Sequence, residues 1–230
     1  MSDAGPATPP RRKRRILGLD DEQRQAQRRT LLLDAALELF GTRGYAKTSI
    51  ELLCQTAGIG TNSFYDLFSS KEDVLIALYD GLTTDLQDAV AVAYVEHHQA
   101  DDPIRPLVSA FVHAATDDPR VAHVAFVQAA GVSAAMEEHR RQTRNRFVAG
   151  LEAIGSDLRD RAGESAGDLS PGDGPTPRRN AVAIVGAIIE MTVDWLNDPD
   201  PDPVEDLIDD IAHHCRRVLD AIVRDALSGT

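Results

Sequence analysis

The chain has 230 residues and a formal net charge of −13, and this length is enough to bury one or two hydrophobic cores. No stretch approaches the roughly 18 uninterrupted apolar residues of a membrane span, and no apolar signal segment follows the N-terminal charges, so we expect a cytoplasmic protein that does not enter a membrane. Two widely separated cysteines, Cys54 and Cys215, favour reduced core residues over a disulfide framework.

The charge is divided unevenly along the chain. Residues 1–80 hold 11 of the 24 Lys and Arg residues and 11 of the 37 Asp and Glu residues, which leaves 13 basic and 26 acidic residues for the other 150. An acidic body repels nucleic acid, so only a local basic surface near the N-terminus could bind it. Residues 1–22 are expected to be a disordered basic arm, and Arg11 to Arg15 within it could be a solvated tail or could contact DNA.

The first predicted helices form a compact unit. A helix from about Gln25 to Thr42 has an apolar stripe at helical spacing. Thr48 or Ser49 can cap the next helix, which Gly58 ends, and another begins within three residues, as a helix-turn-helix requires.

The helix after Gly58 leaves its polar side outside. Three apolar residues at helical spacing anchor it, namely Phe64, Leu67 and Phe68. The small polar or phenolic side chains that this turns outward belong to Thr61, Asn62, Ser63 and Tyr65. Hydroxyls and amides at an exposed helix N-terminus suit the base edges of the DNA major groove. The groups expected to hold phosphates are Tyr45, Lys47, Thr48, Ser49 and Lys71.

These residues carry a family resemblance. The matching segments, in fixed order, are Leu32 to Phe40, Gly44-Tyr45, Thr48-Ser49-Ile50, Ala57-Gly58-Ile59, Ser63-Phe64-Tyr65, and Phe68 with Ser70-Lys71-Glu72. Over about fifty residues the chain resembles the DNA-binding domain of tetracycline-repressor-type (TetR/AcrR) regulators. Leu67 departs from the histidine that is frequent in the family, and Cys54 departs from a small alanine.

The resemblance implies an all-α protein: a three-helix helix-turn-helix DNA-binding domain over residues 23–70, then a helical ligand-binding and dimerisation domain over residues 71–230. The sequence agrees, because helical patterns continue and no convincing strand appears. A long helix from Lys71 towards Glu96 would join the two domains. The helix from Asn180 to Leu196 is apolar nearly all round, so with the last helix it suits a four-helix bundle in a homodimer.

A ligand cavity is expected between the C-terminal helices. The candidate lining residues are Phe111, His123, Phe126, Met191 and Trp195. Core packing explains each of these equally well.

Other motifs have the wrong context. Gly163 to Gly167 fits the Gly-x-Ser-x-Gly pattern of hydrolases, but no strand precedes it. Gly58 to Ser63 lacks the third glycine of a dinucleotide loop. His213-His214-Cys215 cannot chelate one ion alone, because neighbours on a helix point about 100° apart. We therefore expect no catalytic residue, no metal and no cofactor.

The function expected is a ligand-responsive DNA-binding transcriptional regulator, a repressor that binds a palindromic operator and is released by a largely apolar effector. The alternatives are a small-molecule carrier or an enzyme that retains a helix-turn-helix fold, and a nonspecific architectural protein.

Overall fold

The computed structural model describes residues 21–161 and 177–228, which form helices joined by turns without a strand among them. The predicted all-helical class is confirmed. The helices in chain order are α1 (Asp21–Thr42), α2 (Ile50–Ala57), α3 (Thr61–Tyr65), α4 (Lys71–His97), α5 (Ile104–Thr116), α6 (Pro119–Ala122), the π-helical turn η1 (His123–Gln128), α7 (Ala134–Arg161), α8 (Pro177–Asn197) and α9 (Val204–Ser228). None of these described helices is both long enough and apolar enough to cross a membrane. The arm with Arg11 to Arg15 and the Gly163–Gly167 segment lie outside the described residues.

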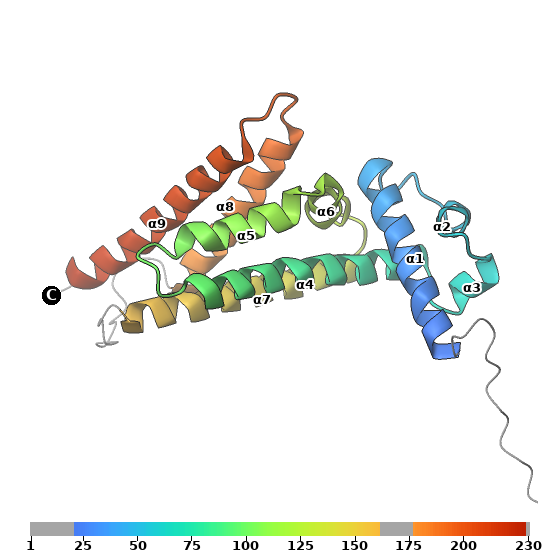
Figure 1. The fold of residues 1–230 in the computed structure, drawn as a ribbon, viewed down its shortest axis with the longest axis horizontal. Helices are drawn as coiled ribbons and strands as arrows, with labels where there is room; N and C mark the ends of the chain where they lie inside the picture. The colour runs from blue at the N-terminus through green and yellow to red at the C-terminus, as the bar shows by residue number, and fades with distance from the viewer. Residues whose placement is uncertain (1–20, 162–176, 229–230) are drawn as a thin grey trace, which may run out of the picture.

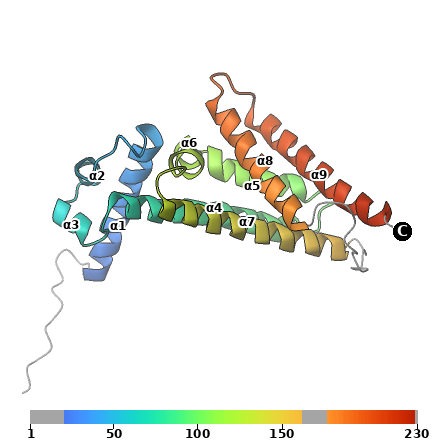
Figure 2. The same ribbon diagram turned by 180° about the vertical axis from the view of Figure 1, so that it is seen from behind.

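The molecule is elongated, with α1, α2 and α3 gathered at one end and the hairpin of α8 and α9 on the side away from them (Figure 1). The same arrangement is seen from behind in Figure 2. Helices α4 and α7 run side by side in the same direction: Glu72 accepts a hydrogen bond from Ser133 near the start of both helices, and Asp157 accepts one from Tyr94 near their ends. The two helices thus form a rod between the ends of the molecule.

In the part of the chain that the structure describes, two large hydrophobic cores join the other helices to this rod. The first joins α1, α2 and α3 to the beginning of α4 and includes Phe40, Leu53 and Phe64, each fully buried. The second lies among α4, α5, α8 and α9, where Leu86 and Ile208 are buried. Burial of these apolar faces is the main force that holds such short helices in place.

Helix ends in the first core follow the sequence signals. The Ser49 hydroxyl accepts the Leu52 N–H at 3.2 Å, which caps α2. Gly58 ends α2 in the left-handed conformation at φ 65°, and the Ile59 N–H returns to the Cys54 carbonyl at 3.0 Å. Ser70 caps α4 by accepting the Asp73 N–H at 3.1 Å. The predicted breaks between these helices are therefore confirmed.

The segment between α5 and α7 differs from the uniform helical pattern of the sequence. After the four residues of α6, the chain widens into the π-helical turn η1, in which the Ala129 N–H bonds to the Val124 carbonyl five residues back, at 3.1 Å. Apolar spacing of three and four residues predicts an ordinary helix and does not indicate where a five-residue hydrogen bond occurs within it.

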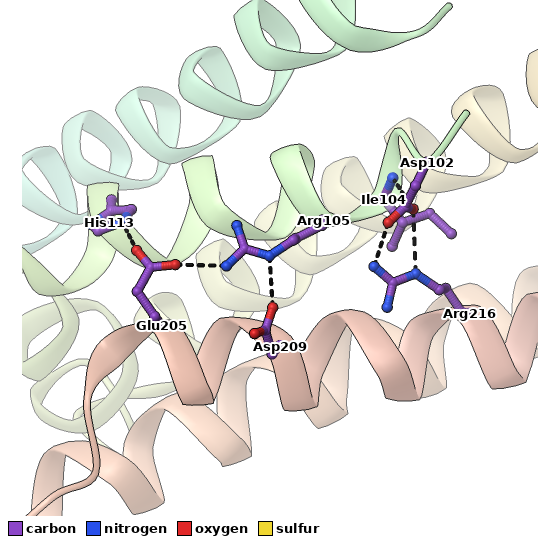
Figure 3. Close-up of polar contacts among 7 residues, drawn as sticks. All are labelled: Asp102, Ile104, Arg105, His113, Glu205, Asp209 and Arg216. Atoms are coloured by element: carbon purple, nitrogen blue, oxygen red, sulfur yellow. Dashed lines mark hydrogen bonds and ion pairs between the residues drawn. The ribbon is translucent and has the colours of Figure 1, made fainter. Parts of the chain in front are cut away.

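Charged side chains fasten α9 across α5 (Figure 3). Arg105 donates to Asp209 at 2.6 Å and to Glu205 at 2.7 Å. His113 lies 3.0 Å from the Asp117 carboxylate and 3.5 Å from that of Glu205. The hydrogen bond and the charge of Asp117 raise the pKa of His113 most, and those of Glu205 raise it further.

Substituting Gly41 by alanine should destabilise the protein. An added Cβ would lie 2.6 Å from the Arg120 Cβ and 3.1 Å from its Cα, so α1 and α6 would have to separate, at a cost of about 1–3 kcal/mol. Gly81→Ala in α4 meets nothing within 4 Å and should stabilise by about 0.5–1 kcal/mol. Urea denaturation would measure both variants, and equal effects would contradict the close α1–α6 contact.

His113 should make stability depend on pH, first through its pairing with Asp117 at the end of α5 and then through Glu205 of α9. Because the pKa of His113 is raised on folding, its contribution is complete below the ordinary value of about 6.5 and is lost as the pH rises through the folded value. Wild type should therefore be more stable than His113→Gln, and by a larger margin at about pH 5.5 than at about pH 8. These two pH values lie on either side of the titration of His113. His213→Gln, at an exposed position of α9, is the control for a general effect of histidine loss. A difference that stays constant with pH would contradict the role of these pairings.

Candidate DNA-binding surface and ligand cavity

Helix α3 exposes its polar edge as the sequence predicts. Phe64 is fully buried and packs edge-to-face against Tyr65, with ring centroids 5.2 Å apart. With this anchor in place, Thr61 and Asn62 are exposed, Ser63 is half-buried and Tyr65 is 58 % exposed. Hydroxyl, amide and phenol groups therefore stand together beside the free N–H groups of the first helical turn, an arrangement suited to base edges and phosphates.

Lys71 is half-buried, and its ammonium is bound by backbone carbonyls of the same unit. Its ammonium donates to the backbone carbonyls of Tyr45 and Thr48, each at 2.8 Å, and lies 4.1 Å from the centre of the Tyr45 ring. Burial lowers the pKa of Lys71. The side chain predicted to hold a phosphate thus ties the α1–α2 connection to the start of α4.

Thr48 is also turned inward. It is 2 % exposed, and its hydroxyl donates to the Gly44 carbonyl at 3.0 Å. Tyr45 is half-buried, and burial, followed by the charge of Glu72, raises the pKa of its phenol. Both residues shape the α1–α2 connection, which explains their occurrence without requiring contact with DNA.

Exposed groups remain around α3. Lys47 and Ser49 stand at the start of α2, although the Ser49 hydroxyl also caps that helix. Arg43 is exposed in the turn after α1, and Arg29 extends across the Phe68 ring at 4.8 Å. Arg29 and Arg43 belong to the N-terminal basic groups from which the sequence predicts a DNA-binding surface.

A cavity of about 530 Å³ lies between α4, α5, α7 and α8. Its walls are almost wholly apolar, and three phenylalanines from different helices meet there. Phe111 stacks on Phe126, with ring centroids 6.2 Å apart, and meets Phe147 edge-on at 6.0 Å. The volume lies within the range of about 300–1,000 Å³ that is usual for small-molecule sites.

Only part of the predicted ligand set lines this cavity. Phe111 and Phe126 do, but His123, Met191 and Trp195 do not. The Trp195 indole donates to the Asp202 carbonyl at 2.7 Å and so fixes the α8–α9 turn. His123 bonds to Gln128, and Met191 packs against the second core.

The wall that sequence reasoning missed comes from α7, α8 and α4, and α7 supplies a face of it that was not predicted. The lining residues of α7 include Phe147, Gly150, Leu151, Gly155 and Leu158. A sequence signal for it was present, because two glycines on the apolar edge of a long helix leave room beside the backbone. An added Cβ on Gly150 would meet nothing within 4 Å.

Polar groups are few at the cavity. Arg146 lies on its wall and donates to the Thr143 hydroxyl at 2.9 Å, while Glu152 is 3.6 Å from Arg178. Cys215 also lines the cavity, and burial raises the pKa of its thiol to about 11, so the thiol stays protonated at neutral pH and is a poor nucleophile. In residues 21–161 and 177–228, no three His, Cys, Asp or Glu side chains are grouped to hold a metal ion.

Comparisons with known proteins agree with this geometry. Residues 32–78 match the family model described as bacterial regulatory proteins of the tetR family. The chain is 39% identical over 67 residues to the transcriptional repressor KstR2 of Rhodococcus jostii, a match that spans only 33% of that relative and 29% of this chain. It is 27% identical over 180 residues to the regulator BetI of Rhizobium meliloti, covering 74% of this chain and 88% of BetI.

A solved structure resembles the chain over most of its length. The regulator FadR of Bacillus subtilis, determined in complex with stearoyl-CoA, aligns with a TM-score of 0.63 at 18% identity, over 87% of this chain and 98% of that one. At such low identity the likeness concerns the fold, which has the same N-terminal helix-turn-helix and helical C-terminal part. Residues 32–78 of this chain thus match the helix-turn-helix part of the tetR family of bacterial regulatory proteins.

Proposed function

We propose that the chain is a cytoplasmic, homodimeric transcriptional repressor that binds a palindromic operator and is released by a largely apolar effector. The observation that carries the proposal is the polar edge of α3, where Thr61, Asn62 and Tyr65 are exposed. A recognition helix of this kind enters the major groove, and twofold symmetry places two copies about 34–36 Å, or one helical turn, apart or at multiples of it.

The homodimer is supported by an unburied strip on α8. Val182 is 43% exposed, and Ala183 and Gly186 on the same side are exposed too, whereas Ile184 and Val185 are buried. Small side chains on an exposed apolar face allow two helices to approach closely. The mass of a single chain in light scattering at micromolar concentration would remove this part of the proposal.

The effector proposed is a molecule with a long apolar part. The cavity offers rings and aliphatic side chains over nearly all of its wall, with Arg146 as a cation for an acidic group. FadR of Bacillus subtilis, which shares the fold, binds stearoyl-CoA, and an acyl chain fits the chemistry of this wall. An effector lowers operator affinity if it binds better to a conformation in which the two α3 helices are not spaced to match the two half-sites. The loss of affinity equals the difference in its affinity for the two conformations.

No catalysis is proposed. The buried thiol of Cys215 is protonated, and the family and the relatives that the chain resembles are described as regulators. A carrier or an enzyme with this fold would have no need of a polar edge on α3.

Asn62→Ala should relax the base preference of the protein. The side chain amide stands exposed at the start of α3, and the loss of a good base-edge contact removes about 1–3 kcal/mol of discrimination. Selection from random duplex DNA should enrich a palindrome with wild type and a more degenerate one with the variant. Enrichment of nothing by wild type would favour a carrier, and identical motifs would remove Asn62 from recognition.

Two lysines should behave differently when each is replaced by methionine. Lys47 is exposed, so Lys47→Met should weaken binding to all sequences and lower the slope of log affinity against log salt by about one. Lys71→Met should leave that slope nearly unchanged and instead destabilise the protein, because two backbone carbonyls lose their donor. Salt titrations of operator binding and urea melts would separate these outcomes. A lowered slope for Lys71→Met would restore Lys71 as a phosphate contact.

A further inference from the structure

The π-helical turn η1 belongs to both halves of the molecule. Val124 and Ala129, inside and directly after η1, are fully buried in the first core with the residues of α1 and α4. Phe126, between them, lines the cavity of the second half. A single turn of helix therefore touches the packing around α1–α3 on one side and the proposed effector site on the other.

Gln128 extends this connection by a specific hydrogen bond. Its Oε1 accepts the backbone N–H of Tyr45 at 2.8 Å, and its Nε2 donates to the His123 Nε2 at 3.0 Å, which orients the amide. The neighbouring Gly44 has φ 91°, and a Cβ added there would lie 3.1 Å from the Gln128 Oε1. The amide thus fits closely against a backbone shape that favours glycine.

The backbone of Tyr45 connects Gln128 to the rest of the helix-turn-helix. The Tyr45 carbonyl accepts the Lys71 ammonium at 2.8 Å, and Lys71 is the first residue of α4, directly beyond α3. The α1–α2 connection is held from one side by η1 and from the other by α4. A displacement of Gln128 removes one of these two restraints.

The π-helical register of η1 differs from that of an ordinary α-helix by one residue. In η1 the Ala129 N–H bonds five residues back, whereas an α-helix bonds four residues back. Changing one register to the other rotates the residues that follow by about 100°, one residue of helix. Because Phe126 and Gln128 are two residues apart in η1, a shift that repositions the Phe126 ring also withdraws the Gln128 amide.

We propose that η1 transmits occupancy of the cavity to the DNA-binding end, and that Gln128 is the positioning residue through which it does so. A molecule in the cavity displaces Phe126 from its stack on Phe111, η1 changes register, and the Tyr45 N–H loses its acceptor. The effect on DNA rests on the proposed function, but the link between the Phe126 ring and the Tyr45 amide does not.

Amide hydrogen exchange at Tyr45 tests this link without a ligand or DNA. Phe126→Ala should speed exchange of the Tyr45 amide by about tenfold, the worth of one hydrogen bond. Phe147→Ala removes an equal ring from the same cavity wall but lies on α7, and it should leave Tyr45 unchanged. Phe126→Leu, a milder change, should act in the same direction if Phe126→Ala does not fold. An unchanged Tyr45 rate in the folded Phe126 variant, or an equal rise in Phe147→Ala, would overturn the proposal.

A double substitution assigns the role to Gln128. Gln128→Leu should speed Tyr45 exchange by itself, and adding Phe126→Ala to it should produce little further change, because both act through one bond. Gln142→Leu, at an exposed glutamine of α7 that donates to Glu138, is the matched control. If the double variant instead speeds Tyr45 exchange by the product of the two single effects, Phe126 acts by another route. That result would contradict the role of Gln128.

Operator binding provides the separate readout for function. Phe126→Ala and Gln128→Leu should both weaken operator affinity by severalfold, while Gln142→Leu keeps the affinity of wild type. If wild type binds no DNA sequence selectively while Tyr45 exchange responds as expected, the proposed function fails and the coupling stands. If the operator is bound but Tyr45 exchange does not respond to Phe126, the coupling fails and the proposed function stands.

Discussion

Burial of Phe64 is the constraint on which the DNA-facing surface depends. Helix α3 has only five residues, far fewer than an isolated helix needs in water. Its conformation must come from tertiary packing, and the fully buried Phe64 ring provides it. With that ring fixed among α1, α2 and α4, the helical spacing turns Asn62 and Tyr65 outward. The polar groups on the surface of α3 are therefore positioned by an apolar contact beneath them.

Packed apolar side chains also join the two ends of the molecule. Because the first core takes in Val124 and Ala129 as well as the residues of α1–α4, it does not end where the helix-turn-helix ends. Arg120 adds to this connection by pairing with Glu38 of α1, beside the close approach at Gly41. The helical body and the helix-turn-helix share packed side chains, so movement in one has a physical path to the other.

Net charge and local charge serve different ends in this chain. The acidic excess lies beyond residue 80, where much of it is used in pairs such as Arg105 with Glu205 and Asp209, or Arg216 with Asp102. Such exposed pairs add little stability individually, but together they orient α9 against α5. The exposed Arg43 and Lys47 of the N-terminal unit take no part in these pairs between α5 and α9.

The sequence alone determined the helical class, the order of the helices and the outward edge of α3, because capping residues, Gly58 and apolar spacing act over a few residues. It also identified Phe111 and Phe126 as candidates for the cavity wall. Only the tertiary structure decided that Lys71 and Thr48 point inward, that α7 supplies much of the cavity wall, and that η1 has a π-helical register. Each of these depends on groups distant in the chain, such as the Tyr45 carbonyl that receives Lys71 from 26 residues away. A local pattern fixes which face of a helix is apolar, but it does not specify the partner that the face or a neighbouring charge will meet.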